Sequence, residues 1–184
     1  MDHHIHAPLI DDEIRQLKAG DYVYITGTIY TARDAAHLRM YQAILEGQPL
    51  PMQLENNVIY YMGPSPARPG HVIGSAGPTT ASRMDKYTPL MMDQGLKGMI
   101  GKGKRSEAVH EAIVRNGGVY FAAVGGAGAL LSKVIKASEV IAYDDLGTEA
   151  IRKMQVEDFP AIVVIDCEGN DLYLEAAAAY RKEK

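Results

Sequence analysis

Hydrophobic positions alternate with polar ones in some parts of the chain and recur every three or four residues in others, which indicates strands interspersed with helices. The clearest strand is predicted over 21–30, DYVYITGTIY, which is rich in β-branched and aromatic residues. A helix is predicted over 33–46, where Ala36, Met40 and Ile44 recur at helical spacing. A strand followed directly by an amphipathic helix is the repeating unit of α/β proteins.

The remaining pattern extends this alternation to the C-terminus. Further helices are predicted over 11–18, 81–94, 106–116 and 129–137, after Gly147, and at the end of the chain around 176–179. Further strands are predicted over 57–62, 71–76, 119–124, 139–143 and 161–166, and 96–103 is predicted as a strand and turn. We see no linker and no repeat, so we expect a single α/β domain over 1–184, with a mixed sheet flanked by helices.

Composition narrows the possible functions. The formal net charge of −4 gives no overall basic field, so we expect no nucleic-acid partner. No run of about 18 apolar residues is present and the first residues do not resemble a leader peptide, so we expect no membrane association and a cytoplasmic location. The single cysteine, Cys167, excludes an intrachain disulfide and a four-thiolate metal or iron–sulfur site built from this chain alone. Any such cluster would require another polypeptide.

Basic side chains follow several predicted strands or begin helices. Arg33 comes after the strand at 21–30, Arg83 lies four residues beyond Thr79 at a helix start, and Lys102, Lys104 and Arg105 share a glycine-rich turn. Turns of this kind gather at one edge of an α/β sheet, where these cations could converge on a dianionic substrate. The alternative is that they are ordinary solvated surface cations.

Thr79 and Thr80 directly precede a predicted helix, where a threonine usually acts as the N-cap. Nearby cations could instead lower the cost of forming a threonine alkoxide. His37 lies one helical turn beyond Arg33, and either supports that residue or is a packing histidine. Cys167 is expected to be buried.

Three motifs fail on inspection. The segment GMIGKGKRS at 98–106 approaches a phosphate-binding loop, but Arg105 occupies the position of the required hydroxyl. The segment VGGAGALL at 124–131 lacks the third glycine of a dinucleotide fingerprint, because Leu131 stands there. The N-terminal histidines are His3, His4 and His6. They lack partners at metal-ligand spacing, so we expect no metal site of this chain's own.

Several segments together resemble one family, the β subunits or C-terminal domains of the oxygen-sensitive iron–sulfur hydro-lyases, which comprise class I fumarases and L-tartrate dehydratases. The segments are TGTIYTARDAAH (26–37), GPTTASRMD (77–85), KGMIGKGKRS (97–106), VGGAGALL (124–131), DLGTEAI (145–151), DFPAIVVID (158–166) and EGNDLY (168–173). The resemblance implies a swivelling β/β/α domain. It further implies a partner α subunit in an α2β2-type assembly, in which three α-subunit cysteines hold a [4Fe-4S] cluster with one iron open to substrate.

Carried onto this sequence, the resemblance implies that Arg33, Arg83 and Lys102 bind the carboxylates of a C4 dicarboxylate. It implies that Thr79 is the catalytic residue that exchanges a proton with substrate carbon. Asp34, His37 and Thr80 are expected to support these four residues. Ser82 departs from the glycine found there in many fumarases, which should affect only the turn.

The function expected from the resemblance is reversible hydration of fumarate to L-malate, by an enzyme that is inactive without its α subunit. Fumarase is preferred because GPTTASRMD and VGGAGALL look closer to that branch of the family. One alternative is dehydration of L-tartrate to oxaloacetate. A second is a non-catalytic anion-binding or assembly module.

Overall fold

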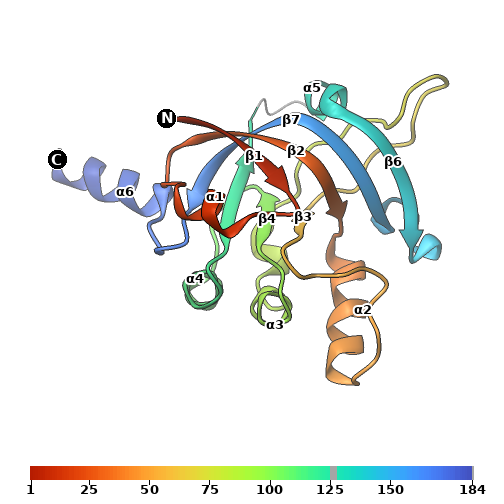
Figure 1. Cartoon of the computed structure of the whole chain (residues 1–184), viewed down its shortest axis with the longest axis horizontal. Helices are drawn as coiled ribbons and strands as arrows, with labels where there is room; N and C mark the ends of the chain where they lie inside the picture. The colour runs from red at the N-terminus through yellow and green to blue at the C-terminus, as the bar shows by residue number, and fades with distance from the viewer. Residues whose placement is uncertain (125–127, 184) are drawn as a thin grey trace.

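The computed structural model describes residues 1–124 and 128–183, and within them seven strands form one mixed sheet (Figure 1). The strands are β1 (Asp2–Ala7), β2 (Tyr22–Thr31), β3 (Val58–Tyr60), β4 (Gly98–Gly101), β5 (Val119–Ala123), β6 (Ile135–Ala142) and β7 (Ile151–Ile165). Their order is β1-β2-β3-β4-β5-β7-β6, and β2 also pairs with β7. That additional pairing closes β2, β3, β4, β5 and β7 into a ring, with β1 and β6 attached outside it.

The direction of the strands determines where their loops meet. β1 to β5 run parallel to their neighbours, whereas β7 is antiparallel to β2, β5 and β6. The C-terminal ends of β2, β3, β4 and β5 therefore lie at one edge of the sheet. Ligand sites in α/β proteins form at this edge.

Helices cover one side of the ring, with α2, α3 and α4 side by side below the sheet in Figure 1. The α-helices are α1 (Asp11–Arg15), α2 (Asp34–Leu45), α3 (Thr88–Asp93), α4 (Glu107–Asn116), α5 (Gly128–Leu131) and α6 (Leu172–Lys182). The 3₁₀ helices are η1 (Ala81–Met84), η2 (Ser132–Val134) and η3 (Asp144–Glu149). α4 has clear ends, because the Ser106 hydroxyl accepts from the Val109 amide and Gly117 adopts the left-handed conformation that closes a helix.

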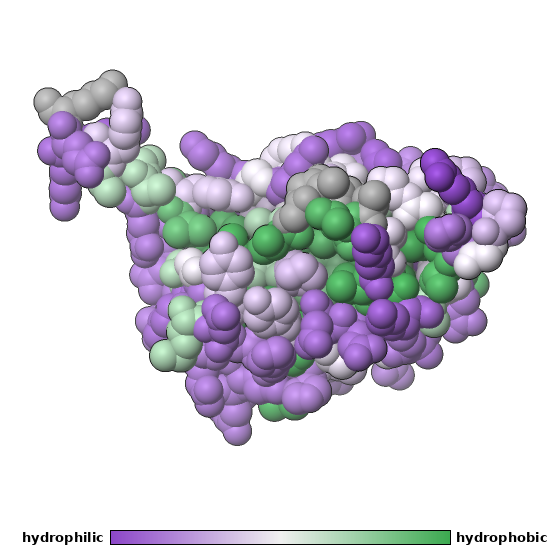
Figure 2. Space-filling model, turned by 90° about the horizontal axis from the view of Figure 1, so that it is seen from above, coloured by the Kyte–Doolittle hydropathy of each residue, from purple (hydrophilic) through white to green (hydrophobic). Residues whose placement is uncertain are grey.

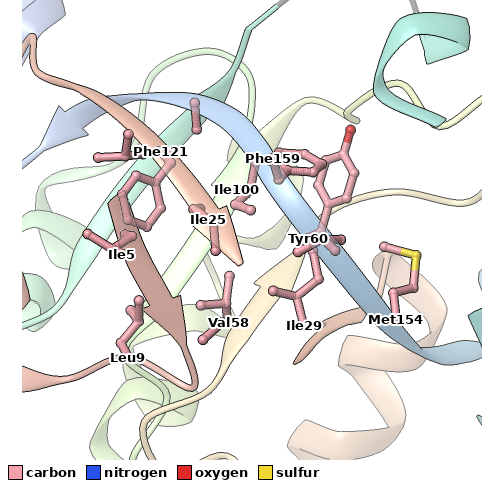
Figure 3. Close-up of a cluster of buried hydrophobic side chains, with 14 of the residues drawn as sticks. Ile5, Leu9, Ile25, Ile29, Val58, Tyr60, Ile100, Phe121, Met154 and Phe159 are labelled. Atoms are coloured by element: carbon pink, nitrogen blue, oxygen red, sulfur yellow. The ribbon is translucent and has the colours of Figure 1, made fainter. Parts of the chain in front are cut away.

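Two hydrophobic clusters stabilise the fold. The first fills the ring, where inward-facing side chains of β2, β3, β4, β5 and β7 meet Ile5 and Leu9 (Figure 3). The second lies between the sheet and helices α2 to α4, and includes Met40, Ile59 and Tyr120. β3 contributes to both, because Ile59 faces the helices while Val58 and Tyr60 face the ring interior.

The α/β class with a mixed sheet and flanking helices is confirmed, and most predicted elements are present. Three differ in extent. The helix predicted over 81–94 divides into η1 and α3, because Thr88 bonds the Met84 carbonyl and Pro89 starts a new helix. The helix predicted over 129–137 gives way to β6 at Ile135, which pairs with β7. The strand predicted over 161–166 is the end of the much longer β7. The helix predicted after Gly147 is wrong, because the 3₁₀ helix η3 ends at Glu149 and β7 begins at Ile151.

In the first half, one strand was missed and one prediction is wrong, and one motif is not described. The N-terminus forms β1, which sequence analysis missed because DHHIHA has little hydrophobic pattern of its own and is held by pairing with β2. Residues 71–76 form an irregular segment that turns back, with the Ser65 amide donating to the Ser75 carbonyl. The glycine turn that follows β5, including Gly126, lies outside the described residues.

Viewed from above, the molecule shows a band of hydrophobic side chains bordered by polar ones, and its last helix projects from one end (Figure 2). That helix, α6, is capped at its N-terminus by Asp171, whose carboxylate accepts from the Tyr173 and Leu174 amides. Within the part of the chain that the structure describes, every helix is too short or too polar to span a lipid bilayer.

Candidate functional site

The candidate site forms where β2, β3 and β4 end. Arg33 follows β2, Gly63 follows β3 and Lys102 follows β4. Because these strands are parallel and adjacent, the three residues lie at the same edge of the sheet. An open pocket of about 550 Å³ lies there, and its lining residues are Gly63, Ser65, Ser75, Gly77, Pro78, Lys102 and Ala123.

Arg33 packs closely against Gly63. A Cβ atom on Gly63 would lie 3.0 Å from Arg33 Cδ and 2.8 Å from the carbonyl oxygen of Thr148. Arg33 holds the N-cap position of α2, and its Nε is buried without a hydrogen-bond partner among the described residues. Glycine after β3 therefore makes room for the Arg33 side chain beside Gly63, which lines the pocket.

Arg83 joins this cluster through Asp34. Its Nε donates to Asp34 Oδ2 at 2.9 Å, while about half of the Arg83 side chain is exposed to solvent. This side-on contact leaves the two terminal nitrogens of Arg83 without a hydrogen bond to any residue within 1–124 and 128–183. Those nitrogens form the face that binds a carboxylate with two parallel hydrogen bonds.

Backbone hydrogen bonds hold Thr79 beside Lys102. The Lys102 amide donates to the Thr79 carbonyl at 3.3 Å, and the Ala81 amide donates to the Lys102 carbonyl at 2.8 Å. The Thr79 amide in turn donates to the carbonyl of Tyr61, at the end of β3, at 2.7 Å. Thr80 holds the N-cap position of η1, but its side chain makes no capping hydrogen bond. The capping interpretation of these threonines is thus wrong for Thr80.

His37 supports the backbone of Arg33. Its ring is fully buried, and Nδ1 lies 2.8 Å from the Arg33 carbonyl oxygen. Burial lowers the pKa of His37 to about 4, so the ring is neutral near pH 7. A neutral ring beside a carbonyl oxygen must carry its proton on Nδ1, which donates to that oxygen. His37 therefore fixes the start of α2 from inside the protein.

Arg105 does not belong to the converging cations, and this expectation is corrected. Its side chain is fully buried and its Nε donates to Asp85 Oδ1 at 2.7 Å. The glycine-rich turn divides its basic residues, because Lys102 and Lys104 are exposed whereas Arg105 turns inward beneath the sheet edge. In the segment that approaches a phosphate-binding loop, Arg105 therefore has a structural role inside the protein.

The N-terminal histidines lie apart from the candidate site. Each faces a different acidic side chain, with His3 at 3.0 Å from Asp21, His4 at 3.4 Å from Asp158 and His6 at 2.6 Å from Glu13. Among the described residues, no group of three histidine, cysteine or acidic side chains is placed to hold a metal ion.

Sequence reasoning missed Gly63 and Tyr61. Gly63 provides the space for Arg33, and Tyr61 supplies the carbonyl that binds Thr79. Both lie at the end of the strand predicted over 57–62, where a Gly-Pro pair follows. The parallel order of β2, β3 and β4 was the missing information, because it brings this strand end between Arg33 and Lys102.

Comparison with known proteins supports one family. A model of the family described as Fumarase C-terminus matches residues 2–176. The chain is 40% identical to Fumarate hydratase 2 of Leishmania major over 171 residues, covering 92% of this chain and 30% of that protein. It is 41% identical to the anaerobic class I fumarate hydratase of Escherichia coli K12 over 163 residues, covering 88% and 30% respectively.

A relative of a different length is also similar. The chain is 36% identical over 173 residues to a putative L(+)-tartrate dehydratase subunit beta of Methanocaldococcus jannaschii, covering 91% of this chain and 89% of that subunit. This chain thus spans about 30% of the fumarate hydratases above and nearly all of the tartrate dehydratase subunit.

Proposed function

Because the chain belongs to the family of fumarase C-terminal domains, we propose that it is the β subunit of a class I fumarate hydratase that converts fumarate and L-malate reversibly. The observation that carries this proposal is the meeting of Arg33, Arg83 and Thr79 with Lys102 at one sheet edge. These are the residues that the family resemblance assigns to substrate.

Charge at this edge suits a dicarboxylate. Three cations, Arg33, Arg83 and Lys102, stand near two carboxylates, which leaves one net positive charge. The carboxylates are Asp34, which binds Arg83, and Glu149, which accepts from the Ala35 amide at 3.4 Å. A C4 dicarboxylate carries two negative charges at neutral pH. Arg83 offers a two-nitrogen face for one carboxylate, and Lys102 a point charge for the other.

Thr79 is proposed to exchange a proton with the substrate carbon beside a carboxylate. A threonine hydroxyl is a weak base, and neighbouring positive charge lowers the cost of its alkoxide. The backbone bonds of Thr79 to Tyr61 and Lys102 hold it beside one of these cations. The remaining parts of the reaction must come from outside this chain.

The residues of this chain do not fit a [4Fe-4S] cluster. Cys167 is its single cysteine and, contrary to expectation, is only partly buried. This partial burial still raises the pKa of the thiol, which disfavours the thiolate that binds iron. We therefore propose that a partner α subunit holds the cluster in an α2β2-type assembly. When bound, such a cluster supplies a Lewis-acidic iron.

Two alternatives remain as outcomes of the test. Dehydration of L-tartrate is favoured by the match to nearly the full length of a tartrate dehydratase subunit beta. An anion-binding or assembly module would use the same cations without chemistry.

The deciding experiment is anaerobic affinity purification of this chain from its native host. We expect a cysteine-bearing partner, iron, and hydration of fumarate in the eluate. Tartrate dehydration without fumarate hydration would establish the first alternative. An iron-free homo-oligomer from repeated purifications, which binds dicarboxylates but converts none, would establish the second.

A further inference from the structure

We propose that Arg105 is the positioning residue of this site: its buried guanidinium, acting through Asp85 and Tyr61, fixes Thr79, Arg83 and Lys102 relative to one another. The dicarboxylate that these residues would bind rests on the proposed function. The positioning itself is a property of this chain and is tested separately.

Arg105 is bonded on several sides inside the protein. Its Nε donates to Asp85 Oδ1 at 2.7 Å, and its Nη2 donates to Thr88 Oγ1 at 2.9 Å and to the Tyr61 hydroxyl oxygen at 3.1 Å. The guanidinium also lies over the rings of Tyr61 and Tyr120, at 5.1 and 4.8 Å from their centroids. A buried charge with so many fixed contacts has little freedom to move, so the groups around it are held at defined positions.

Asp85 connects Arg105 to the segment that carries Arg83. Asp85 is the C-cap residue of η1, two positions after Arg83. One of its oxygens accepts from Arg105 and the other accepts from the Ser106 amide at 2.7 Å, where α4 begins. The turn bearing Arg83 is thereby tied to the turn bearing Arg105.

Tyr61 connects Arg105 to Thr79. The Thr88 hydroxyl has one proton, which it donates to the Met84 carbonyl. In the 3.2 Å contact between the two hydroxyl oxygens, Tyr61 is therefore the donor and Thr88 the acceptor. The Tyr61 side chain is therefore held by both Arg105 and Thr88. Its backbone carbonyl accepts from the Thr79 amide at 2.7 Å.

Lys102 completes the arrangement. It lies three residues before Arg105 and exchanges backbone hydrogen bonds with Thr79 and Ala81. The Thr79 segment, the Arg83 turn and the Lys102 turn therefore meet above one guanidinium. Lysine could not replace it, because an ammonium group lacks the planar fork that reaches three partners at once.

The test compares Arg105→Lys and Tyr61→Phe with two matched controls. Arg115→Lys makes the same exchange in an arginine that also pairs with an aspartate, Asp93, but at the far end of α4. Ile25→Val removes one methylene from the ring interior and so lowers overall stability without touching the network.

The first readout is hydrogen exchange of the Thr79, Ala81 and Lys102 amides in the full 184-residue chain. We expect their protection, measured relative to amides of the ring strands, to fall at least tenfold in Arg105→Lys and Tyr61→Phe and to stay unchanged in both controls. If Arg105→Lys does not fold, Tyr61→Phe alone carries the test. Unchanged relative protection would overturn the proposal, whatever the protein's activity.

The second readout is kinetic and uses the chain assembled with its α subunit. The kinetics are measured well below the melting temperature of each variant. Positioning predicts a rise in KM for fumarate together with a fall in kcat, so that kcat/KM falls about tenfold or more. A purely structural role predicts a lower Tm with both constants unchanged, and that result would overturn the proposal. An inactive wild-type assembly with responsive amides would instead contradict the proposed function and leave the positioning role supported.

Discussion

At the scale of single residues, Arg83 is held on one side and open on the other. Asp34 accepts from its Nε, and the terminal nitrogens make no hydrogen bond to a described residue. We expect Arg83→Ala to lower kcat/KM for fumarate by more than about tenfold in the assembled enzyme, because a charged two-point contact to a carboxylate is lost. Steady-state kinetics measure this. Wild-type kinetics would remove Arg83 from the carboxylate-binding residues.

Folding should be unaffected by that substitution, because the Arg83 side chain is half exposed and its ion pair contributes little to stability. Arg115→Ala is the matched control, since Arg115 is also half exposed and pairs with an aspartate away from the pocket. We expect both variants to melt within a few degrees of the wild type, and only Arg83→Ala to lose activity.

His37 makes stability depend on pH. Its pKa is about 4 in the folded chain, where burial and the nearby Arg105 charge disfavour the protonated ring and outweigh the opposing effects of the Arg33 carbonyl and Asp34. The unfolded chain binds this proton near pH 6.5, so His37's contribution is complete above that pH and is lost as pH falls toward 4. From pH 7.5 to 5 this amounts to about 2 kcal/mol in the free energy of unfolding.

Urea denaturation at both pH values measures this difference, and His37→Gln should remove most of it. Aspartates whose pKa is lowered in the fold, such as Asp21 and Asp93, act below this pH interval. An equal pH dependence in the variant and the wild type would show that another group is responsible.

At the scale of elements, local pattern was sufficient where a segment carries its own signal. β2, α2 and α4 were predicted close to their observed bounds, because apolar spacing and terminal residues indicate them. β1 and the first part of β7 were missed. Their sequences are polar or charged on one face, and pairing with β2 and β6 makes them strands.

The same limit applies to the candidate site. Arg33, Arg83 and Lys102 were identified from family motifs, and the structure brings them to one edge. Arg105 was misassigned because position in a basic turn does not reveal whether a side chain points outward or into a layer of tyrosines. The close approach at Gly63 depends on strand order, which the sequence alone does not specify.

The junction after β3 yields a further prediction. Gly63→Ala places a Cβ within 3.0 Å of Arg33 and against the Thr148 carbonyl, which belongs to η3. One of the two must move, so we expect KM for fumarate to rise several-fold with kcat changing less. Gly70→Ala is the control for backbone strain without a clash, because Gly70 has φ +82° and no atom lies within 4 Å of the added carbon. An unchanged KM would mean that Arg33 adjusts without loss of binding.

At the scale of the whole molecule, the ring and its two outer strands should differ in how readily they open. Each strand of the ring has partners on both sides, whereas within the described part of the chain β1 pairs only with β2 and β6 only with β7. Native-state hydrogen exchange should show similar, high protection across β2, β4, β5 and β7, and lower protection in β1 and β6. Exchange of a single ring strand well before the others would contradict this.

Closure also has a mechanical consequence for the site. In an open sheet, neighbouring strands can splay apart at one end, and the distance between their loops varies freely. In a closed sheet, any such displacement must be passed around the whole circumference and break the β2–β7 contact. The rim that carries Arg33 and Lys102 therefore moves as one rigid unit. In the proposed assembly, this unit would close over substrate as a whole rather than by separate movements of its loops.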